Sequence, residues 1–225
     1  MRDGRRYFPR RYGARRLLFN LILAIGLIGS VAGDPAAAAE KRLLLFGDSL
    51  TAGYGLSEDQ GFAAQLQRAL DARGHTVEVI NAGVSGDTSA GGLARLDWSL
   101  ASKPTHALLE LGANDALRGL DPAAMEQNLD GIITGMKDAG AKVLLAGMVA
   151  PRNLGPDYQK AFEGAFPRLA AKHDIALYPF FLEGLPGQND LIQADGLHPN
   201  ADGVAVIVER IMPAIEALLA DGETQ

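Results

Sequence analysis

The sequence predicts a three-layer α/β/α fold built around a five-stranded parallel sheet. From Glu40 onward, short apolar runs alternate with longer segments in which apolar side chains recur every three or four residues. The short runs are typical of strands buried on both faces, and the longer segments are typical of helices with one apolar face. Strands that alternate with helices form βαβ crossovers, which place a parallel sheet between two layers of helices.

The individual elements follow in order along the chain. The expected strands are residues 42–46, 76–82, 106–112, 142–149 and, most weakly, 175–179. The expected helices between them are residues 61–74, 88–102, 121–140 and 157–173. Asp121 with Pro122 gives the third helix a good start, and Gly140 gives it a good stop. A last helix is expected after the segment HPNADG, with Pro213 kinking or dividing it.

The first 39 residues have the composition of a cleavable signal peptide. Residues 2–16 carry seven arginines and one acid, and residues 17–32 form an apolar run. That run is short for a membrane span, which needs about 20 residues, and an uncleaved anchor is the alternative. The segment AAAAE offers an A-x-A processing site, with cleavage after Ala39. We therefore expect one mature domain, residues 40–225, located in the periplasm or secreted, with Sec export favoured over the twin-arginine route.

The charge balance and the lack of cysteine exclude several classes of partner. The chain has a formal net charge of −6, and removing residues 1–39 takes away seven positive and two negative charges, which leaves −11. A field of that sign does not attract nucleic acid or an anionic membrane. Without cysteine, neither a disulfide framework nor a thiolate metal site can form. We expect a monomer without a stable membrane anchor after signal cleavage, acting on a small molecule.

Small and glycine-rich segments follow the first three expected strands. They read GDSLTAGYG, NAGVSGDTSAGG and GANDALRG. Ligands of open parallel sheets bind beyond the carboxyl ends of the strands, and glycine lets backbone N–H groups approach a ligand. With the strand order 2-1-3-4-5, Ser49 would lie between the loop of Gly83 and Asn114.

These segments carry the groups that a serine nucleophile requires. The backbone N–H groups of Ser49 and Gly83 and the side-chain amide of Asn114 can stabilise an oxyanion, and each such donor contributes about 2.7–4 kcal/mol in the transition state. The nucleophile also needs a base, and His198 stands in the segment ADGLHPN, three residues after Asp195. At that spacing the carboxylate can orient the imidazole and leave its other nitrogen for Ser49.

The other histidines have structural interpretations. His75 lies in a helix-to-strand turn, His106 opens the third strand at the opposite end of the sheet, and His173 ends a helix, where a cation suits the dipole. Distance is an objection to His198, because the fifth strand would lie roughly 14 Å from the first at about 4.8 Å per strand. The long loop of residues 180–197 could reach back across the intervening strands.

The aspartates of the same segments are interpreted as loop-fixing residues. Asp48, Asp87 and Asp115 can each accept hydrogen bonds from nearby backbone groups. For Asp48, a role in tuning the site is the alternative.

Four quoted blocks together carry a family resemblance. FGDSLTAGYG, NAGVSGDTSAGG, ELGANDALRG and DGLHPN resemble the four blocks of the SGNH (GDSL) hydrolase family, in the family's order. The sequence is most similar to the branch of secreted acyl-CoA thioesterase I, arylesterase and lysophospholipase enzymes, over nearly all of residues 41–220. The resemblance implies a flavodoxin-like strand order. It also implies Ser49 as nucleophile, His198 as general base and acid, Asp195 as its orienting partner, and an oxyanion hole formed by Ser49, Gly83 and Asn114.

The resemblance implies a serine esterase that acts on carboxylic esters or thioesters, such as aryl esters, acyl-CoA or lysophospholipids, and that requires no metal or organic cofactor. Six apolar side chains in the loops expected around the site could line an acyl groove. They are Leu117, Leu120, Leu154, Phe180, Phe181 and Leu185. A carbohydrate-ester deacetylase of the same fold is one alternative, which a groove rich in leucine and phenylalanine disfavours. An exported lipid-binding protein without activity is the other, which the complete set of site residues disfavours.

Overall fold

The computed structural model describes Met1 and residues 41–220, and it confirms the predicted sheet. The parallel strands pair in the order β2-β1-β3-β4-β5. They are Lys41–Gly47 (β1), Val77–Asn81 (β2), His106–Glu110 (β3), Lys142–Ala146 (β4) and Ala176–Tyr178 (β5). The predicted signal peptide falls outside the described residues, apart from Met1. In the part that is described, no helix is long and apolar enough to span a membrane.

The register brings the carboxyl ends of β1, β2 and β3 to the same end of the sheet. Leu45 of β1 pairs with Asn81 at the end of β2, and Gly47 pairs with Glu110 at the end of β3. Residues 43–46 of β1 are completely buried because helices cover both faces of the sheet. The segments that follow β1, β2 and β3 therefore start side by side.

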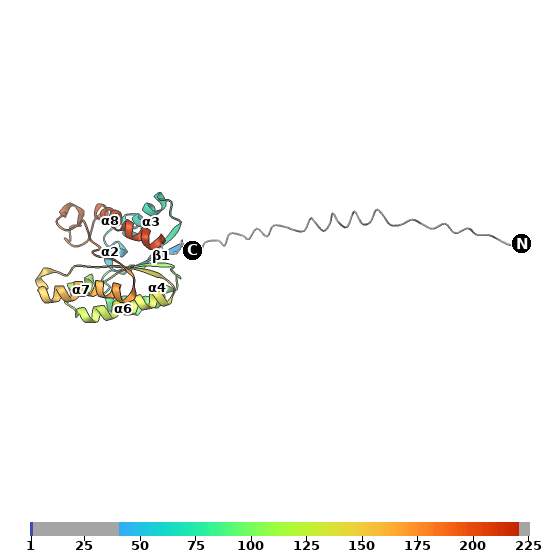
Figure 1. Cartoon of the computed structure of the whole chain (residues 1–225). Coiled ribbons are helices and arrows are strands. Elements are labelled where there is room, and N and C mark those ends of the chain that lie inside the picture. Colours follow the sequence, from blue (N-terminus) through green and yellow to red (C-terminus); the bar gives the residue numbers. More distant parts are fainter. Residues whose placement is uncertain (2–40, 221–225) are drawn as a thin grey trace. The chain divides into compact units, whose positions relative to one another are not determined.

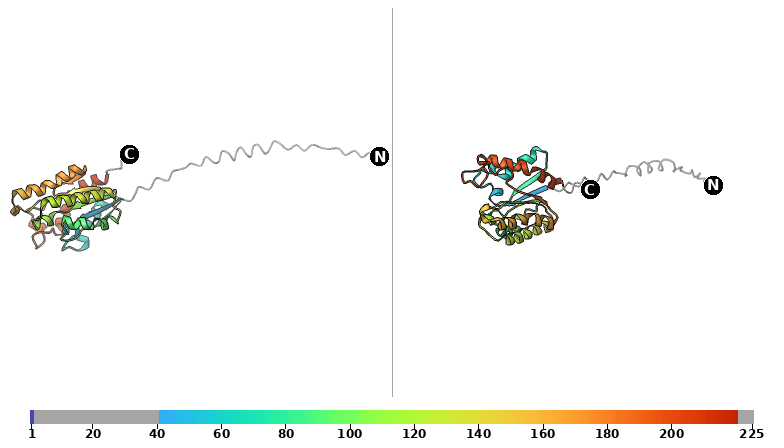
Figure 2. Two further views of the ribbon diagram at one scale, coloured as in Figure 1. Left: turned by 90° about the horizontal axis from the view of Figure 1, so that it is seen from below. Right: turned by 60° about the vertical axis from the view of Figure 1, so that its left-hand side comes forward.

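Helices cover the two faces of the sheet as Figures 1 and 2 show. On one face lie α3 (Phe62–Ala72) and α8 (Ala201–Ala220). On the other lie α4 (Ser89–Leu100), α6 (Pro122–Asp138) and α7 (Pro156–His173). Each helix turns its apolar stripe toward the strands, so that the sheet has a buried core on each side.

Short helices that the sequence did not predict follow two of the strands. They are α2 (Ser49–Ala52), directly after β1, and α5 (Ala113–Leu117), shortly after β3. The predicted third strand ends early because Gly112 adopts a left-handed conformation, with φ of 117°, and caps α5. Single 3₁₀ turns lie in other loops, at Glu58–Gln60 (η1), Arg152–Leu154 (η2) and Asn189–Leu191 (η3).

The sequence predicts that Pro213 kinks or divides the last helix, and in the structure Pro213 does not divide it. Helix α8 continues from Ala201 to Ala220. Pro213 lies on the exposed face, and Glu209, four residues earlier, is exposed as well. The carbonyl group of Glu209, which receives no hydrogen bond from Pro213, can therefore be hydrated. This makes a proline tolerable inside the helix.

Candidate active site

Ser49 lies on a sharp turn where β1 passes directly into α2. The turn is fixed by Asp48, whose Oδ1 accepts the N–H of Leu50 at 3.0 Å and caps the helix. Gly53, in a left-handed conformation, ends α2 after one turn. At Gly47 a Cβ atom would collide with the side chains of Thr51 and Glu110, so the close approach of strand and helix requires glycine.

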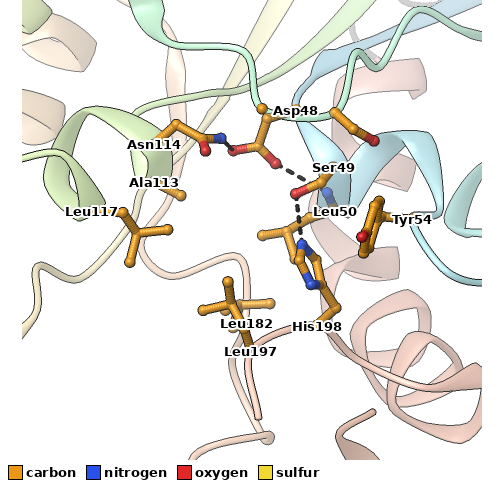
Figure 3. A pocket seen from close by; sticks show the side chains of 12 residues that line it. Asp48, Ser49, Leu50, Tyr54, Ala113, Asn114, Leu117, Leu182, Leu197 and His198 are labelled. Carbon is orange, nitrogen blue, oxygen red and sulfur yellow. Dashed lines mark hydrogen bonds between the residues drawn. The ribbon is translucent and has the colours of Figure 1, made fainter. Parts of the chain in front are cut away.

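His198 and Asp195 form a hydrogen-bonded chain with Ser49, and Figure 3 shows the bond between His198 and Ser49. Nε2 of His198 lies 2.9 Å from Oγ of Ser49, and Nδ1 lies 2.6 Å from Oδ2 of Asp195. Oδ1 of Asp195 also accepts the N–H groups of His198 and Leu197. The hydrogen bond from the His198 N–H, followed by the one from its ring, lowers the pKa of Asp195 to about 2. Asp195 is therefore a carboxylate at neutral pH, and it favours the tautomer that leaves Nε2 free to accept a proton from Ser49.

The loop that carries His198 reaches back to α2, as the sequence predicts. Gln193 holds it there, since its Nε2 donates to the carbonyl groups of Tyr54 and Pro199 at 2.8 Å each. The backbone N–H of Gln193 donates to the carbonyl of His198, also at 2.8 Å. The ring of Tyr54 lies against the imidazole, with centroids 4.6 Å apart. The loop therefore spans the distance between β5 and β1 and fixes the imidazole beside the nucleophile.

Asn114 reaches the same place from α5. Its Nδ2 donates to Oδ2 of Asp48 at 3.0 Å, and the residue lines the pocket next to Ser49. An amide nitrogen has two hydrogens, so the second remains for a ligand. The neighbouring Asp115 is buried and accepts both the N–H and the hydroxyl of Ser89, at 2.8 and 2.6 Å, which anchors α5 to the start of α4. This is the loop-fixing role that the sequence predicts.

The predicted oxyanion role of Gly83 does not fit the structure. Its N–H donates to Oδ1 of Asn81 at 3.0 Å, and its Cα packs against the backbone of Ala52. Gly86, three residues later in the same loop, lines the pocket instead. Within residues 41–220 its N–H has no hydrogen-bond partner, and the same holds for the N–H of Ser49. The predicted loop therefore lies beside Ser49, but the N–H of Gly83 is already bonded and Gly86 is the glycine that borders the pocket.

The loop of Gly86 is held on both sides. Arg118, which follows α5, donates from Nη2 to the carbonyl of Gly86 at 2.7 Å. Asp87 forms an ion pair with Arg95 of α4, and Nη2 of Arg95 donates to the carbonyl of Gly47 at 3.0 Å. These bonds tie the loop after β2 to the end of β1, so the N–H of Gly86 and the hydroxyl of Ser49 keep a fixed relation.

A pocket of about 340 Å³ opens over Ser49. Its polar side contains Asp48, Ser49, Ser85, Gly86, Asn114 and His198, and its apolar side contains Leu50, Tyr54, Ala113, Leu117, Leu182 and Leu197. The two sides put reacting groups next to a surface for an apolar substituent, which is the composition expected of a small-molecule site.

The predicted acyl groove is only partly correct. Of the six predicted side chains, Leu117 lines the pocket, whereas Leu120, Leu154 and Phe180 lie outside its lining. Phe181 and Leu185 belong to the core, with exposed fractions of 0% and 3%, and Phe181 packs edge-on against Phe62. The sequence-based prediction missed five other residues that line the pocket: Leu50, Tyr54, Ala113, Leu182 and Leu197. Two of them could have been found from the sequence, because Leu50 and Leu197 are each adjacent to a predicted triad residue.

The sequence also missed Glu110, which lies completely buried under the nucleophile turn. Burial raises the pKa of its carboxyl group well above the ordinary value, and the charge of Asp48 raises it further. Burial likewise raises the pKa of Asp48, although the hydrogen bonds from Leu50 and Asn114 oppose this shift. The segment ELGAND offers Glu110 as a candidate, but an acid inside an apolar run gives no sign of its partners.

The remaining histidines have the structural surroundings that the sequence predicts. Nε2 of His75 lies 3.1 Å from Glu216, and Nε2 of His173 lies 2.6 Å from Asp130. His106 pairs with Leu43 at the start of β3, at the edge of the sheet opposite Ser49.

The chain is similar in sequence and in fold to known proteins. The chain matches the GDSL-like Lipase/Acylhydrolase family over residues 45–206. It is 44% identical over 206 residues to Esterase TesA of Pseudomonas aeruginosa, which covers 91% of this chain and 100% of the relative. It is 40% identical over 184 residues to Thioesterase 1/protease 1/lysophospholipase L1 of Escherichia coli K12, which covers 81% of this chain and 87% of the relative. The crystal structure of psychrotrophic esterase EstA from Pseudoalteromonas, inhibited by monoethylphosphonate, has a TM-score of 0.77 at 37% identity and covers 80% of this chain and 100% of that one.

Proposed function

This chain belongs to the GDSL-like lipase/acylhydrolase family and is an ester hydrolase, and from that premise we propose that Ser49 is its nucleophile, with His198 and Asp195 completing a catalytic triad. The observation that carries the proposal is the hydrogen-bonded chain from Asp195 through His198 to Ser49. It contains each part that nucleophilic catalysis by serine requires, in reach of the next.

The reaction proceeds in two steps at this site. Nε2 of His198 takes the hydroxyl proton as Oγ of Ser49 attacks the carbonyl carbon, and the carboxylate of Asp195 stabilises the resulting imidazolium. His198 then gives this proton to the departing alcohol or thiol, which leaves an acyl-enzyme. A water molecule then attacks the acyl group while His198 takes its proton, and His198 passes that proton to Oγ of Ser49 as the acid is released.

The oxyanion of both steps is held by three donors. These are the N–H groups of Ser49 and Gly86 and the second amide hydrogen of Asn114. The support is that each group borders the pocket and has a hydrogen left to donate. Donors that are already in place when the charge develops are the strongest contribution an enzyme of this kind makes.

The substrates are esters or thioesters with an apolar acyl or aryl group. The leucine side chains that line the pocket support an apolar substituent. The relatives' names, which include an esterase, an arylesterase and a thioesterase/lysophospholipase, support the same range of leaving groups. A carbohydrate deacetylase is disfavoured because the wall away from Ser49 offers few hydrogen-bonding side chains.

The protein acts in the periplasm or outside the cell, as a monomer and without a cofactor. The composition of residues 1–39 supports export. Fractionation of cells expressing the full chain should find the enzyme, shortened to a start near Glu40, outside the cytoplasm.

The nucleophile is tested by Ser49→Ala. We expect kcat for p-nitrophenyl esters to fall at least about 10³-fold, because no other group can form the acyl-enzyme. A fluorophosphonate should label Ser49 in the folded enzyme and lose this selectivity on denaturation. The matched control is Ser57→Ala, which removes an exposed hydroxyl bonded to Asp59 and should retain kcat. Undiminished turnover by Ser49→Ala would overturn the proposed mechanism.

A further inference from the structure

Glu110 is a buried carboxyl group that the proposed reaction does not use. It is the last residue of β3, it has an exposed fraction of 0%, and it pairs with Gly47 just before the nucleophile turn. Its Oε2 accepts the hydroxyl of Thr51 at 2.8 Å and the N–H of Asp48 at 3.3 Å. Through these two bonds it holds both the start and the middle of the turn that carries Ser49.

The second oxygen of Glu110 has no such support. Oε1 is buried and makes no hydrogen bond to any described residue. A buried carboxylate with one unsatisfied oxygen is costly, because nothing replaces the water that the charge has lost. A carboxylic acid at the same place carries no net charge, so this geometry favours the protonated form.

Asp48 is in the opposite situation. Both of its oxygens accept an N–H hydrogen, from Leu50 and from Asn114, and the residue caps the start of α2. Two adjacent carboxyl groups cannot both ionise easily in a buried site, and the one with more hydrogen bonds to its charged form loses its proton first. Asp48 therefore holds the negative charge of the pair.

The other charged groups around the pair act mainly on Asp48. His198 and Asp87 influence it from the two neighbouring loops, and Arg95 of α4 donates to the carbonyl of Gly47 between them. Asp48 is the charged group that acts most strongly on Glu110, and burial and this charge together raise the pKa of Glu110.

We propose that Glu110 is a positioning residue that supports the nucleophile turn as a neutral carboxylic acid, so that Asp48 remains the single carboxylate that holds Asn114 toward the oxyanion. This inference rests on the proposed function for its catalytic consequence. The protonation of Glu110 itself is independent of which residue is the nucleophile.

The consequence for activity is a dependence on pH that one substitution should remove. Ionisation of Glu110 at alkaline pH would place a second negative charge beside Asp48 and disturb the bond to Asn114. Glu110→Gln has the same size and is always neutral, so it should keep kcat within about threefold at neutral pH and lack an alkaline decrease that the wild type shows. Glu110→Ala leaves Thr51 and the N–H of Asp48 without an acceptor, and it should lose about 10- to 10²-fold in kcat with a smaller change in KM.

The protonation state can be measured without any turnover. Wild-type protein with ¹³C-labelled glutamate side chains should show one carboxyl resonance in the protonated position at neutral pH, after the others have titrated. Glu110→Gln should remove that resonance, and Glu78→Gln, an exposed glutamate of β2, should leave it in place. A wild-type spectrum without a protonated resonance would contradict the proposal whether or not the variant folds, and the variant is needed only to assign the resonance.

Three results would overturn the proposal. The first is a wild-type spectrum in which every glutamate is ionised at neutral pH. The second is a protonated resonance that persists in Glu110→Gln. The third is a Glu110→Gln enzyme that loses as much kcat as Glu110→Ala. Each is distinguishable from failure of the proposed function, which would appear as an active Ser49→Ala enzyme.

Discussion

At the scale of single residues, the site depends on which groups keep their charge. Asp195 lies on an exposed loop, yet its pKa is about 2 because it accepts the backbone N–H and the ring N–H of His198 and the N–H of Leu197. Asp48 and Glu110 have pKa values shifted in the other direction by burial. Hydrogen bonds to its charged form therefore keep Asp195 ionised under ordinary conditions. In the buried pair of Asp48 and Glu110, they favour ionisation of Asp48 alone.

Asp195→Asn should change both catalysis and the acid sensitivity of the fold. We expect kcat to fall by up to about 10⁴-fold, because an amide favours the wrong tautomer of His198. The folded pKa of Asp195 is lowered from 3.8 to about 2, so its stabilising contribution is fully present above about pH 4 and is lost as the pH falls through about 2.

The measurement is urea unfolding of both proteins between pH 2 and pH 6. The stability difference between wild type and Asp195→Asn should be greatest above about pH 4 and should decrease steadily as the pH approaches 2. Asp97→Asn, at an exposed position of α4, serves as the control. A stability difference that stays constant over this range would show that Asp195 is not ionised preferentially in the folded protein.

At the scale of elements, α4 holds the site although it contributes no group to the pocket. Its first residue, Ser89, binds Asp115 and so anchors α5. Later in the same helix, Arg95 binds Asp87 and the carbonyl of Gly47, and its guanidinium lies 4.0 Å over the ring of Phe46. A helix on one face of the sheet therefore fixes the three loops that follow β1, β2 and β3.

Arg95→Met tests the role of α4, since it removes these hydrogen bonds and keeps an unbranched apolar chain against Phe46. We expect kcat to fall about 10- to 10²-fold with a smaller change in KM. The reason is that Asp87 loses its ion pair with residue 95, so the adjacent Gly86 is held less firmly. The free energy of unfolding should fall by about 1–3 kcal/mol, since partly buried charged hydrogen bonds are lost.

The matched control for this variant is Arg168→Met. Arg168 also forms an ion pair, with both oxygens of Glu126, but this pair connects the outer surfaces of α6 and α7. Its loss should cost less than about 1 kcal/mol and leave kcat unchanged. If Arg95→Met loses stability but keeps its kcat, then α4 supports the fold alone and does not position the oxyanion donors.

At the scale of the whole molecule, the sequence was sufficient for the sheet and for the meeting of distant segments. Apolar runs identify the strands because burial on both faces leaves few polar positions in them. The long loop after β5 predicts that His198 can return to Ser49, and the structure shows the contact. Whether a loop residue faces the pocket or points away from it was not predictable from the sequence, because the local conformation of the backbone determines this. Gly83 and Gly86 share a loop, and in the structure the N–H of Gly83 bonds to Asn81 whereas Gly86 borders the pocket.

The residues after β5 show the same limit. The N–H of Phe181 donates to the carbonyl of Gly147 at 2.9 Å, and the Cα of Gly147 lies so close to Pro179 that a side chain there would collide with its carbonyl. This tight contact turns Phe181 into the core and leaves Leu182 facing the pocket. No pattern in the letters PFFLEG indicates that choice.

Leu182 lines the pocket but was not among the residues of the groove predicted from sequence. Substitutions at this position can therefore show which of the two surfaces binds the acyl chain. The walls of the pocket come from α2, α5 and the two loops that contribute Leu182 and Leu197, so filling the position of Leu182 should shorten the acyl chain that fits. If Leu182→Trp excludes about two methylene groups, at about 0.8 kcal/mol each, the ratio of kcat/KM for long over short p-nitrophenyl esters should fall about tenfold. Leu120→Trp, at an exposed position outside the pocket, should leave the ratio unchanged. The reverse pattern would mean that acyl chains run over the outer loops, and that the cavity above Ser49 holds only the reacting carbonyl group.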